Sequence, residues 1–230
     1  MKKIIIISLA IICIVLCIGA CSEKEYEFDE NYEYDGVSLI GKWREREYNE
    51  DQYQVYEFLE NGDVNCIIYS FGIEMARFEA SYTIVGKNTL NITWKDGEQT
   101  DTNRFSISED KKFLKLCEVA SYTGEMTLVP YDLSYNKSNE ALVGVWKSND
   151  DNGEIFSFFE NYTGYADGLL GGYSFTYSTK DSSVFICVEA IDGVKHSVEA
   201  MEYSVSADTL TLTGKDANGK SVVLTFTRVN

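Results

Sequence analysis

Few residues in this chain have the types and spacing that catalysis or metal binding requires. His196 is the only histidine, so a metal site with several histidines is excluded. A Ser–His or Cys–His pair could be built only around this one residue. Its place after Lys195, at the start of an expected strand, favours a surface position. Carboxylates are abundant, but nearly every acid falls in an expected turn or on the polar side of a strand, so no pair stands out for acid–base work. We therefore expect no enzyme activity, no catalytic residue, no cofactor and no metal site.

Two loops approach known ligand-binding patterns without matching them. Residues 149–154, Asn-Asp-Asp-Asn-Gly-Glu, offer oxygen ligands but lack the spaced acids and the closing Glu of an EF-hand calcium loop. Residues 168–172, Gly-Leu-Leu-Gly-Gly, lack the Lys and the Ser or Thr of a phosphate-binding loop. We interpret both segments as connecting turns.

The N-terminus predicts export. Lys2 and Lys3 precede an apolar run over 4–18, and Gly19 and Ala20 follow it, which is the pattern of a signal peptide over residues 1–20. The run is shorter than the roughly 20 residues of a spanning helix. The alternative is an uncleaved anchor helix that continues through Cys21.

The end of this segment, Ile-Gly-Ala-Cys over 18–21, resembles the lipobox of bacterial lipoproteins, with Ile where that family usually has Leu. The resemblance implies that Cys21 carries a diacylglyceryl group and becomes the mature N-terminus. Two acyl chains suffice for stable anchoring. We thus expect a protein that is lipid-anchored in the cell envelope, on the outer face of the cytoplasmic membrane or at an outer membrane if the host has one.

The remaining cysteines are Cys66, Cys117 and Cys187, because Cys13 and Cys17 leave with the signal. An odd count leaves at least one thiol unpaired. Either Cys66 pairs with Cys117, or all three are buried as small apolar side chains, which is common for free Cys.

The chain is strongly acidic. Its formal charge is −17, and removal of the two signal lysines leaves 18 basic and 37 acidic residues, hence 18 − 37 = −19. Such a surface excludes nucleic-acid binding. Residues 22–37 hold seven acids among sixteen residues, so we expect residues 21–37 to form a disordered, extended tether.

After the tether, the sequence repeats. Leu-Ile-Gly-Lys-Trp over 39–43 returns as Leu-Val-Gly-Val-Trp over 142–146, and each copy is followed by a strand-like run that ends in Glu-Asn, at 60–61 and 160–161. Self-similarity of this kind indicates duplicated structural units. We place unit 1 at 38–132, a linker at 133–139 and unit 2 at 140–230. A single larger barrel built from both units is the alternative.

Both units read as antiparallel β structure. Expected strands lie at 54–59, 64–69, 77–85, 89–94, 103–107, 113–118 and 125–129, then at 154–159, 172–177, 184–189, 197–205, 209–213 and 221–229. Breaks at Asn61-Gly62 and at 86–88, 95–97 and 109–111 carry turn residues that predict hairpins. Within Leu90–Trp94 the apolar residues alternate with polar ones, as in a half-buried strand. Any helix should be short and near 71–76. The fold class is therefore all-β, with two tandem small antiparallel barrels or half-barrels.

With Gly41-Lys42-Trp43 and Gly144-Val145-Trp146 at the start of two such units, the chain resembles the small lipocalin-like domains found in tandem in bacterial lipoproteins. In that family the Gly-x-Trp opens the first strand, and the Trp closes one end of the barrel beneath an Arg of the last strand. The resemblance implies this closing role for Gly41, Trp43, Gly144, Trp146 and Arg228. Unit 1 departs from it, since the corresponding place falls near Pro130.

We expect a non-enzymatic binding module for a small apolar ligand or a protein partner. The alternative, from a different class, is a structural or inhibitory protein with solidly packed barrels, whose acidic surface engages a basic partner. An enzyme that uses carboxylates ranks third, for want of a convergent nucleophile or base.

Overall fold

The computed structural model describes residues 26–47, 49, 52–95, 99–118, 124–132, 135–136, 138–150, 153–168, 171–189, 195–216 and 218–229. The predicted signal and Cys21 lie outside these residues. The described residues contain no helix, and therefore no helix among them could cross a membrane. The all-β expectation is confirmed for this part of the chain.

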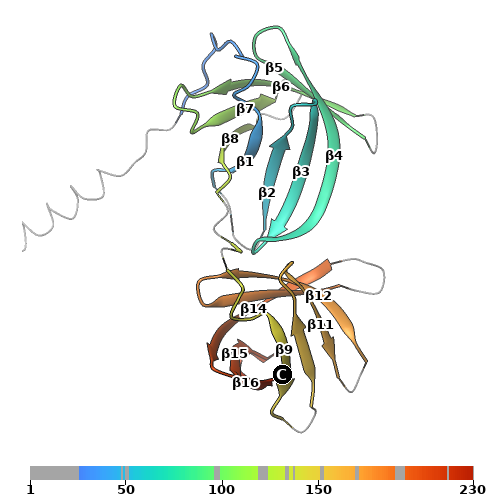
Figure 1. Ribbon diagram of the computed structural model, residues 1–230. Coiled ribbons are helices and arrows are strands. Elements are labelled where there is room, and N and C mark those ends of the chain that lie inside the picture. The colour runs from blue at the N-terminus through green and yellow to red at the C-terminus, as the bar shows by residue number, and fades with distance from the viewer. Residues whose placement is uncertain are drawn as a thin grey trace, which may run out of the picture.

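The described strands form two tandem antiparallel barrels (Figure 1). Barrel 1 contains β1 (Gly41–Glu45), β2 (Tyr53–Phe58), β3 (Asp63–Ser70), β4 (Ile73–Val85), β5 (Thr89–Trp94), β6 (Thr100–Ile107), β7 (Leu114–Glu118) and β8 (Glu125–Pro130). Barrel 2 contains β9 (Gly144–Ser148), β10 (Ile155–Phe158), β11 (Thr163–Asp167), β12 (Tyr173–Lys180), β13 (Ser183–Glu189), β14 (Lys195–Ser206), β15 (Thr209–Lys215) and β16 (Ser221–Arg228). Each strand pairs with its chain neighbour, and β8 and β16 close their barrels onto β1 and β9. The single larger barrel is thereby excluded.

Turn chemistry explains the hairpins. Gly62 has a φ of 86°, and the Asn61 side chain accepts a hydrogen bond from the backbone of Asp63 at 3.1 Å, so the β2–β3 reversal uses both predicted residues. The expectation of a short helix near 71–76 is wrong. Phe71 and Gly72 have φ values of 46° and 79°, and two successive positive values make the tight turn of a two-residue hairpin between β3 and β4.

Strand β11 was not expected from the sequence. Its inward residues are Gly164 and Ala166, which carry too little apolar surface to produce a visible alternation. They are small because large neighbours occupy the space. A Cβ atom at Gly164 would lie 2.1 Å from the Phe175 ring.

The barrel cores are built alike. The indole of Trp43 donates to the Leu39 carbonyl oxygen at 2.8 Å, and that of Trp146 donates to the Leu142 carbonyl oxygen at 2.7 Å. All four residues are buried. These pairs plug one end of each barrel, which we call the closed end.

The expectation of a disordered tether is wrong for residues 26–37. Tyr32 and Tyr34 pack edge-on against Phe105, each with ring centroids 5.6 Å apart, and extend the core of barrel 1. Acids of the segment pair with bases of the barrel: Glu30 with Arg104, Glu33 with Lys87, and Asp35 with Lys111. Interleaved aromatic residues therefore bury apolar surface while the barrel supplies cations, which removes the like-charge repulsion on which the expectation rested.

An aromatic interface joins the barrels. The ring of Phe71, in the β3–β4 turn, stacks on Phe185 of β13 with centroids 4.8 Å apart, and Tyr135 meets Phe185 edge-on. Asn136 is tied to Thr179 by two hydrogen bonds of 2.8 and 3.0 Å. The segment between the barrels is thus fastened to β12, and barrel 1 contacts barrel 2 through its β3–β4 hairpin (Figure 1).

Candidate functional site

The duplication allows the two barrels to be compared position by position. Trp43 pairs with Tyr56, and Trp146 pairs with Phe156, so the tryptophans set a common register. Following the strand ladders from there identifies the inward positions beyond the closed end, which we call the mouth of each barrel. In barrel 1 these include Tyr56, Ile92, Trp94, Asp101, Asn103, Leu116 and Met126, and in barrel 2 they include Phe156, Ile186, Val188, Glu199, Met201, Leu212 and Leu224.

The mouth of barrel 1 is a small pocket of about 280 Å³, lined by all seven of the residues named for it. Asp101 lies at its wall, where the Trp94 indole donates to one carboxylate oxygen at 2.6 Å and the Gln99 amide donates to the other at 3.1 Å. No basic side chain lines this pocket. It therefore combines aromatic rings with a carboxylate that only neutral donors hold.

Two further groups beside this mouth are electrostatically perturbed. Burial raises the pKa of the Cys66 thiol to about 11, and the nearby Glu45 carboxylate adds to that rise. Burial also raises the pKa of Tyr56, with further contributions from Cys66 and Glu45. Both groups stay protonated at neutral pH, so the thiol is not a nucleophile here.

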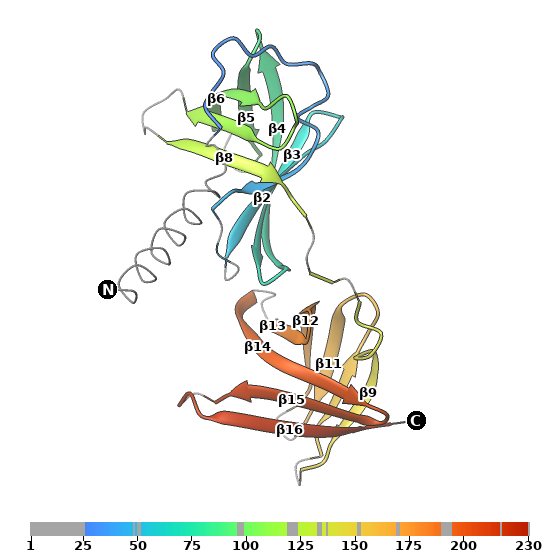
Figure 2. The same ribbon diagram turned by 90° about the vertical axis from the view of Figure 1, so that its left-hand side faces the viewer.

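Barrel 2 opens differently, through its wall. Strand β14 pairs with β15 only from Glu202 to Ser206, whereas β15 pairs with β16 along its whole length. The β15–β16 hairpin therefore diverges from β14 (Figure 2). A pocket of about 920 Å³ lies at the divergence, and we call it the barrel 2 cleft.

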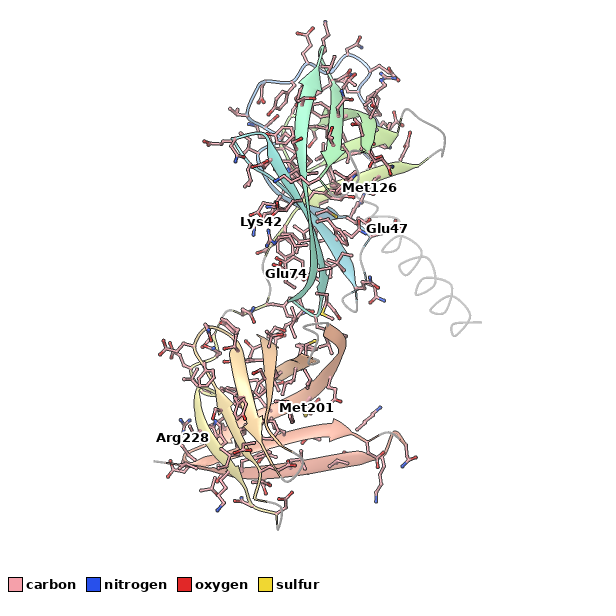
Figure 3. All side chains as sticks on the ribbon, turned by 90° about the vertical axis from the view of Figure 1, so that its right-hand side faces the viewer. Lys42, Glu47, Glu74, Met126, Met201 and Arg228 are labelled. Atoms are coloured by element: carbon pink, nitrogen blue, oxygen red, sulfur yellow. The ribbon has the colours of Figure 1, made fainter. Side chains whose placement is uncertain are left out.

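The inward surface of the barrel 2 cleft is apolar. It is formed by Met201, Leu212, Val222 and Leu224, with Glu199 at one edge. Leu224 is 38 % exposed, which is high for a residue whose register partner, Leu212, is buried. Figure 3 labels one lining residue of each site, Met126 at the barrel 1 mouth and Met201 at the barrel 2 cleft.

The family-motif residues lie at the closed ends. The Arg228 guanidinium stands over the Trp146 ring, 4.1 Å from its centroid, and donates to the Val143 carbonyl oxygen at 2.9 Å. Gly144 has a φ of 140°, and a Cβ there would lie 2.6 Å from Arg228, so this glycine leaves room for the guanidinium. In barrel 1, Pro130 pairs with Trp43 in place of the Arg.

None of Gly41, Trp43, Gly144, Trp146 and Arg228 lines the barrel 1 mouth or the barrel 2 cleft. Their positions are those of supports for barrel closure. Cys21 lies outside the described residues.

The other groups considered for chemistry do not converge. Cys66 and Cys117 are free thiols, so the suggested disulfide between them is not formed. Cys187 is buried. His196 is on β14, and its side chain is outside what the structure describes. Within the described residues, no group of three or more His, Cys, Asp or Glu side chains could hold a metal ion. The loops at 149–154 and 168–172 each include residues that are not described.

Sequence reasoning missed the mouth residues of β6. Asp101 and Asn103 continue the inward alternation of Phe105 and Ile107 toward the start of the strand. An acid and an amide on the face that is otherwise apolar were the available signal, because polar groups on an inward face need partners or a ligand.

The family similarity found for this chain lies in barrel 2. Comparison with curated proteins finds no match. Residues 140–225 are similar to a family of unknown function, DUF5640, and this match spans the second barrel from before β9 into β16.

Proposed function

We propose that this protein is a lipid-anchored, non-enzymatic binding protein of the bacterial cell envelope, and that barrel 2 holds a small apolar ligand. The observation that carries the proposal is the barrel 2 cleft, where Met201, Leu212, Val222 and Leu224 offer apolar surface at an opening of the barrel. About 200 Å² of apolar ligand surface removed from water contributes about 5 kcal/mol at ~25 cal/mol per Å². Losses of ligand freedom offset part of this gain, so we expect micromolar to millimolar affinity.

Charge narrows the ligand class. Three acids, Glu199, Glu202 and Asp216, line the cleft against one base, Lys215, and the whole chain carries a formal charge of −17. A carboxylate ligand would be repelled, whereas a neutral one would not. We therefore propose a neutral apolar ligand, such as a long-chain alcohol, rather than a fatty acid.

The lipid anchor of the proposal rests on the lipobox resemblance at Cys21. If Cys21 is lipidated, the docking of residues 26–37 on barrel 1 shortens the free segment between the lipid and the barrel. Five residue steps separate Cys21 from Tyr26, and they span at most about 17 Å at ~3.3 Å per residue. Barrel 1 would then stay near the leaflet, whereas a free tether would allow about 50 Å.

The first experiment is native mass spectrometry of residues 26–230 before and after organic extraction, followed by titration with dodecanol and dodecanoate. An extracted mass, or saturable dodecanol binding, supports the proposal. An empty protein that binds neither probe refutes the apolar carrier and favours a structural or inhibitory role.

A pair of neighbouring substitutions tests the location. Leu224→Gln places an amide on the inward face of the cleft, and Val223→Gln places the same amide on the outward face of β16. We expect Leu224→Gln to weaken dodecanol binding roughly tenfold or more, since burying a Leu side chain is worth ~1.5–3 kcal/mol. Val223→Gln is the matched control and should bind as the parent does. Equal effects of both changes would refute the assignment to the cleft.

The anchor is tested separately. Cys21→Ser in the full chain should release the protein from the membrane fraction, and labelled fatty acid should be incorporated into the parent chain only. Retention of the variant in membranes would refute lipidation at Cys21 and favour the uncleaved anchor helix.

A further inference from the structure

The two mouths have the same backbone positions and different chemistry. At four equivalent positions barrel 1 has the more polar or aromatic side chain. Glu45, Tyr56, Trp94 and Asn103 of barrel 1 correspond to Ser148, Phe156, Val188 and Met201 of barrel 2. An acid is present in both, as Asp101 and Glu199. The duplicated units have therefore diverged most clearly where a ligand would enter, and barrel 1 does not fit the apolar ligand proposed for barrel 2.

The barrel 1 mouth carries two carboxylates: Glu125, which pairs with Lys115, and Asp101, which no described base neutralises. Asp101 is bound by Trp94 and Gln99, which are neutral donors, and no ion pair of Asp101 or Glu45 occurs within the described part of the chain. Asp101 is only partly buried, so its carboxylate is accessible at this opening.

The basic groups near this mouth are engaged by residues other than Asp101. The Arg46 guanidinium lies 5.4 Å from the centroid of the Phe113 ring, Arg104 pairs with Glu30, and Lys115 pairs with Glu125 at 2.7 Å. Arg104 and Lys115 are on outward positions, since they alternate with the inward Asn103, Phe105 and Leu116.

Aromatic rings complete the site. Tyr56 and Trp94 line the same pocket as Asp101, and their ring faces attract cations, by ~0.5–2 kcal/mol depending on desolvation. A volume of about 280 Å³ suits a headgroup with a short aliphatic portion rather than a long chain. The formal charge of −17 on the whole chain would also raise the local concentration of cations.

We propose that the mouth of barrel 1 is a binding site for a small organic cation, an alkylammonium group held by the carboxylate of Asp101 and by the rings of Tyr56 and Trp94. The hydrogen bond from Trp94 to Asp101 fixes the carboxylate beside the ring, so one ligand nitrogen can meet both. This site is separate from the barrel 2 cleft, and its occupancy does not depend on an apolar ligand there.

The test uses residues 26–230 labelled with 5-fluorotryptophan, which yields one fluorine resonance from each of Trp43, Trp94 and Trp146. The Trp94 resonance is assigned with Trp94→Phe. The probes are n-butylammonium, the neutral n-pentanol of similar size, and potassium ion. We expect n-butylammonium to shift the Trp94 resonance saturably, while the Trp146 resonance stays in place.

Two variants locate the charge. Asp101→Asn keeps an acceptor for Trp94 and removes the carboxylate, and we expect it to weaken n-butylammonium binding at least tenfold. Glu79→Gln removes a carboxylate from the outer face of β4, where Glu79 pairs with Lys95, and is expected to leave binding unchanged. A Trp94 resonance in unliganded Asp101→Asn that stays well separated from its position in the urea-unfolded protein shows that the mouth is still folded.

Four results would overturn the proposal: no saturable shift, an equal response to n-pentanol, full competition by an equal concentration of potassium ion, or equal losses in Asp101→Asn and Glu79→Gln. Leu224→Gln separates this site from the function proposed for barrel 2. It should weaken dodecanol binding roughly tenfold or more and leave n-butylammonium binding intact, so that either site can fail alone.

Discussion

Replacing Gly164 by Val should strongly destabilise barrel 2, and combining it with Phe175→Ala should cost much less than the sum of the two single changes. Gly164 faces Phe175 across the β11–β12 ladder. At the equivalent place in barrel 1, Val64 faces Ala80. The two barrels thus fill one core position in opposite ways, with a large side chain on either the first or the second strand of the pair.

The magnitude follows from the geometry. A Cβ at Gly164 would lie 2.1 Å from the Phe175 ring and 2.7 Å from the Ser157 carbonyl oxygen. We expect Gly164→Val to cost about 3 kcal/mol through overpacking, and Phe175→Ala to cost about 3–5 kcal/mol through the cavity it leaves. The double variant recreates the arrangement of barrel 1 and should cost only about 2–4 kcal/mol, because the Val fills part of the cavity. Contact with the Ser157 oxygen keeps the rescue incomplete.

Native-state hydrogen exchange is the suitable assay, because it reports the opening free energy of each barrel separately. Amides of β12 and β13 should lose protection in each single variant, and the loss in the double variant should be far smaller than the sum of the two single losses. The control is the reverse exchange in barrel 1, Val64→Gly with Ala80→Phe, which should show the same non-additivity in β3–β5 only. If the double variant loses the sum of the two single effects, the proposed equivalence of the two cores is wrong.

Three further perturbations address the supports around the barrels. Gly72→Ala should loosen the inter-barrel interface, because the added Cβ would lie 2.4 Å from the Tyr135 ring and the backbone there has a φ of 79°. Nuclear spin relaxation should then give the two barrels separate tumbling times, and one shared time would contradict this. Backbone amides of Ser38 and Val37 hold the pKa of Asp35 down to about 2. The stabilising effect of Asp35 on the docked segment is therefore complete above the unfolded pKa of ~3.9 and is lost as pH falls through about 2. Titration of the Asp35 carboxyl carbon resonance checks this, and a midpoint near ~3.9 would refute it. Arg228→Leu should lower barrel 2 stability by about 2 kcal/mol through loss of the stack on Trp146 and two carbonyl contacts, as measured by urea denaturation. Arg228→Lys should recover little, because an ammonium cannot reproduce the planar stack.

Local patterning predicted the strands that have a strong apolar face, and it failed where that face is weak or polar. The alternation of Leu90–Trp94 and the Asn61-Gly62 turn were sufficient to place β5 and the β2–β3 reversal. Strand β11 escaped because Gly164 and Ala166 are matched to large neighbours on other strands. That information is carried by Phe175, which is eleven positions away from Gly164, and not by β11 itself.

The sequence by itself determined an all-β chain with two related units, because period-two alternation, turn residues and the repeated Gly-x-Trp are all local features. Only the tertiary structure decided where the barrels open, which residues meet there and how the N-terminal segment behaves. Asp101 and Trp94 come together because β5 and β6 pair in one register, and the barrel 2 cleft exists because β15 leaves β14 after a few pairs. The acids of residues 26–37 are ordered because barrel 1 supplies Lys87, Arg104 and Lys111. Each of these outcomes depends on contacts between segments distant in the chain, whose free energies no local pattern contains.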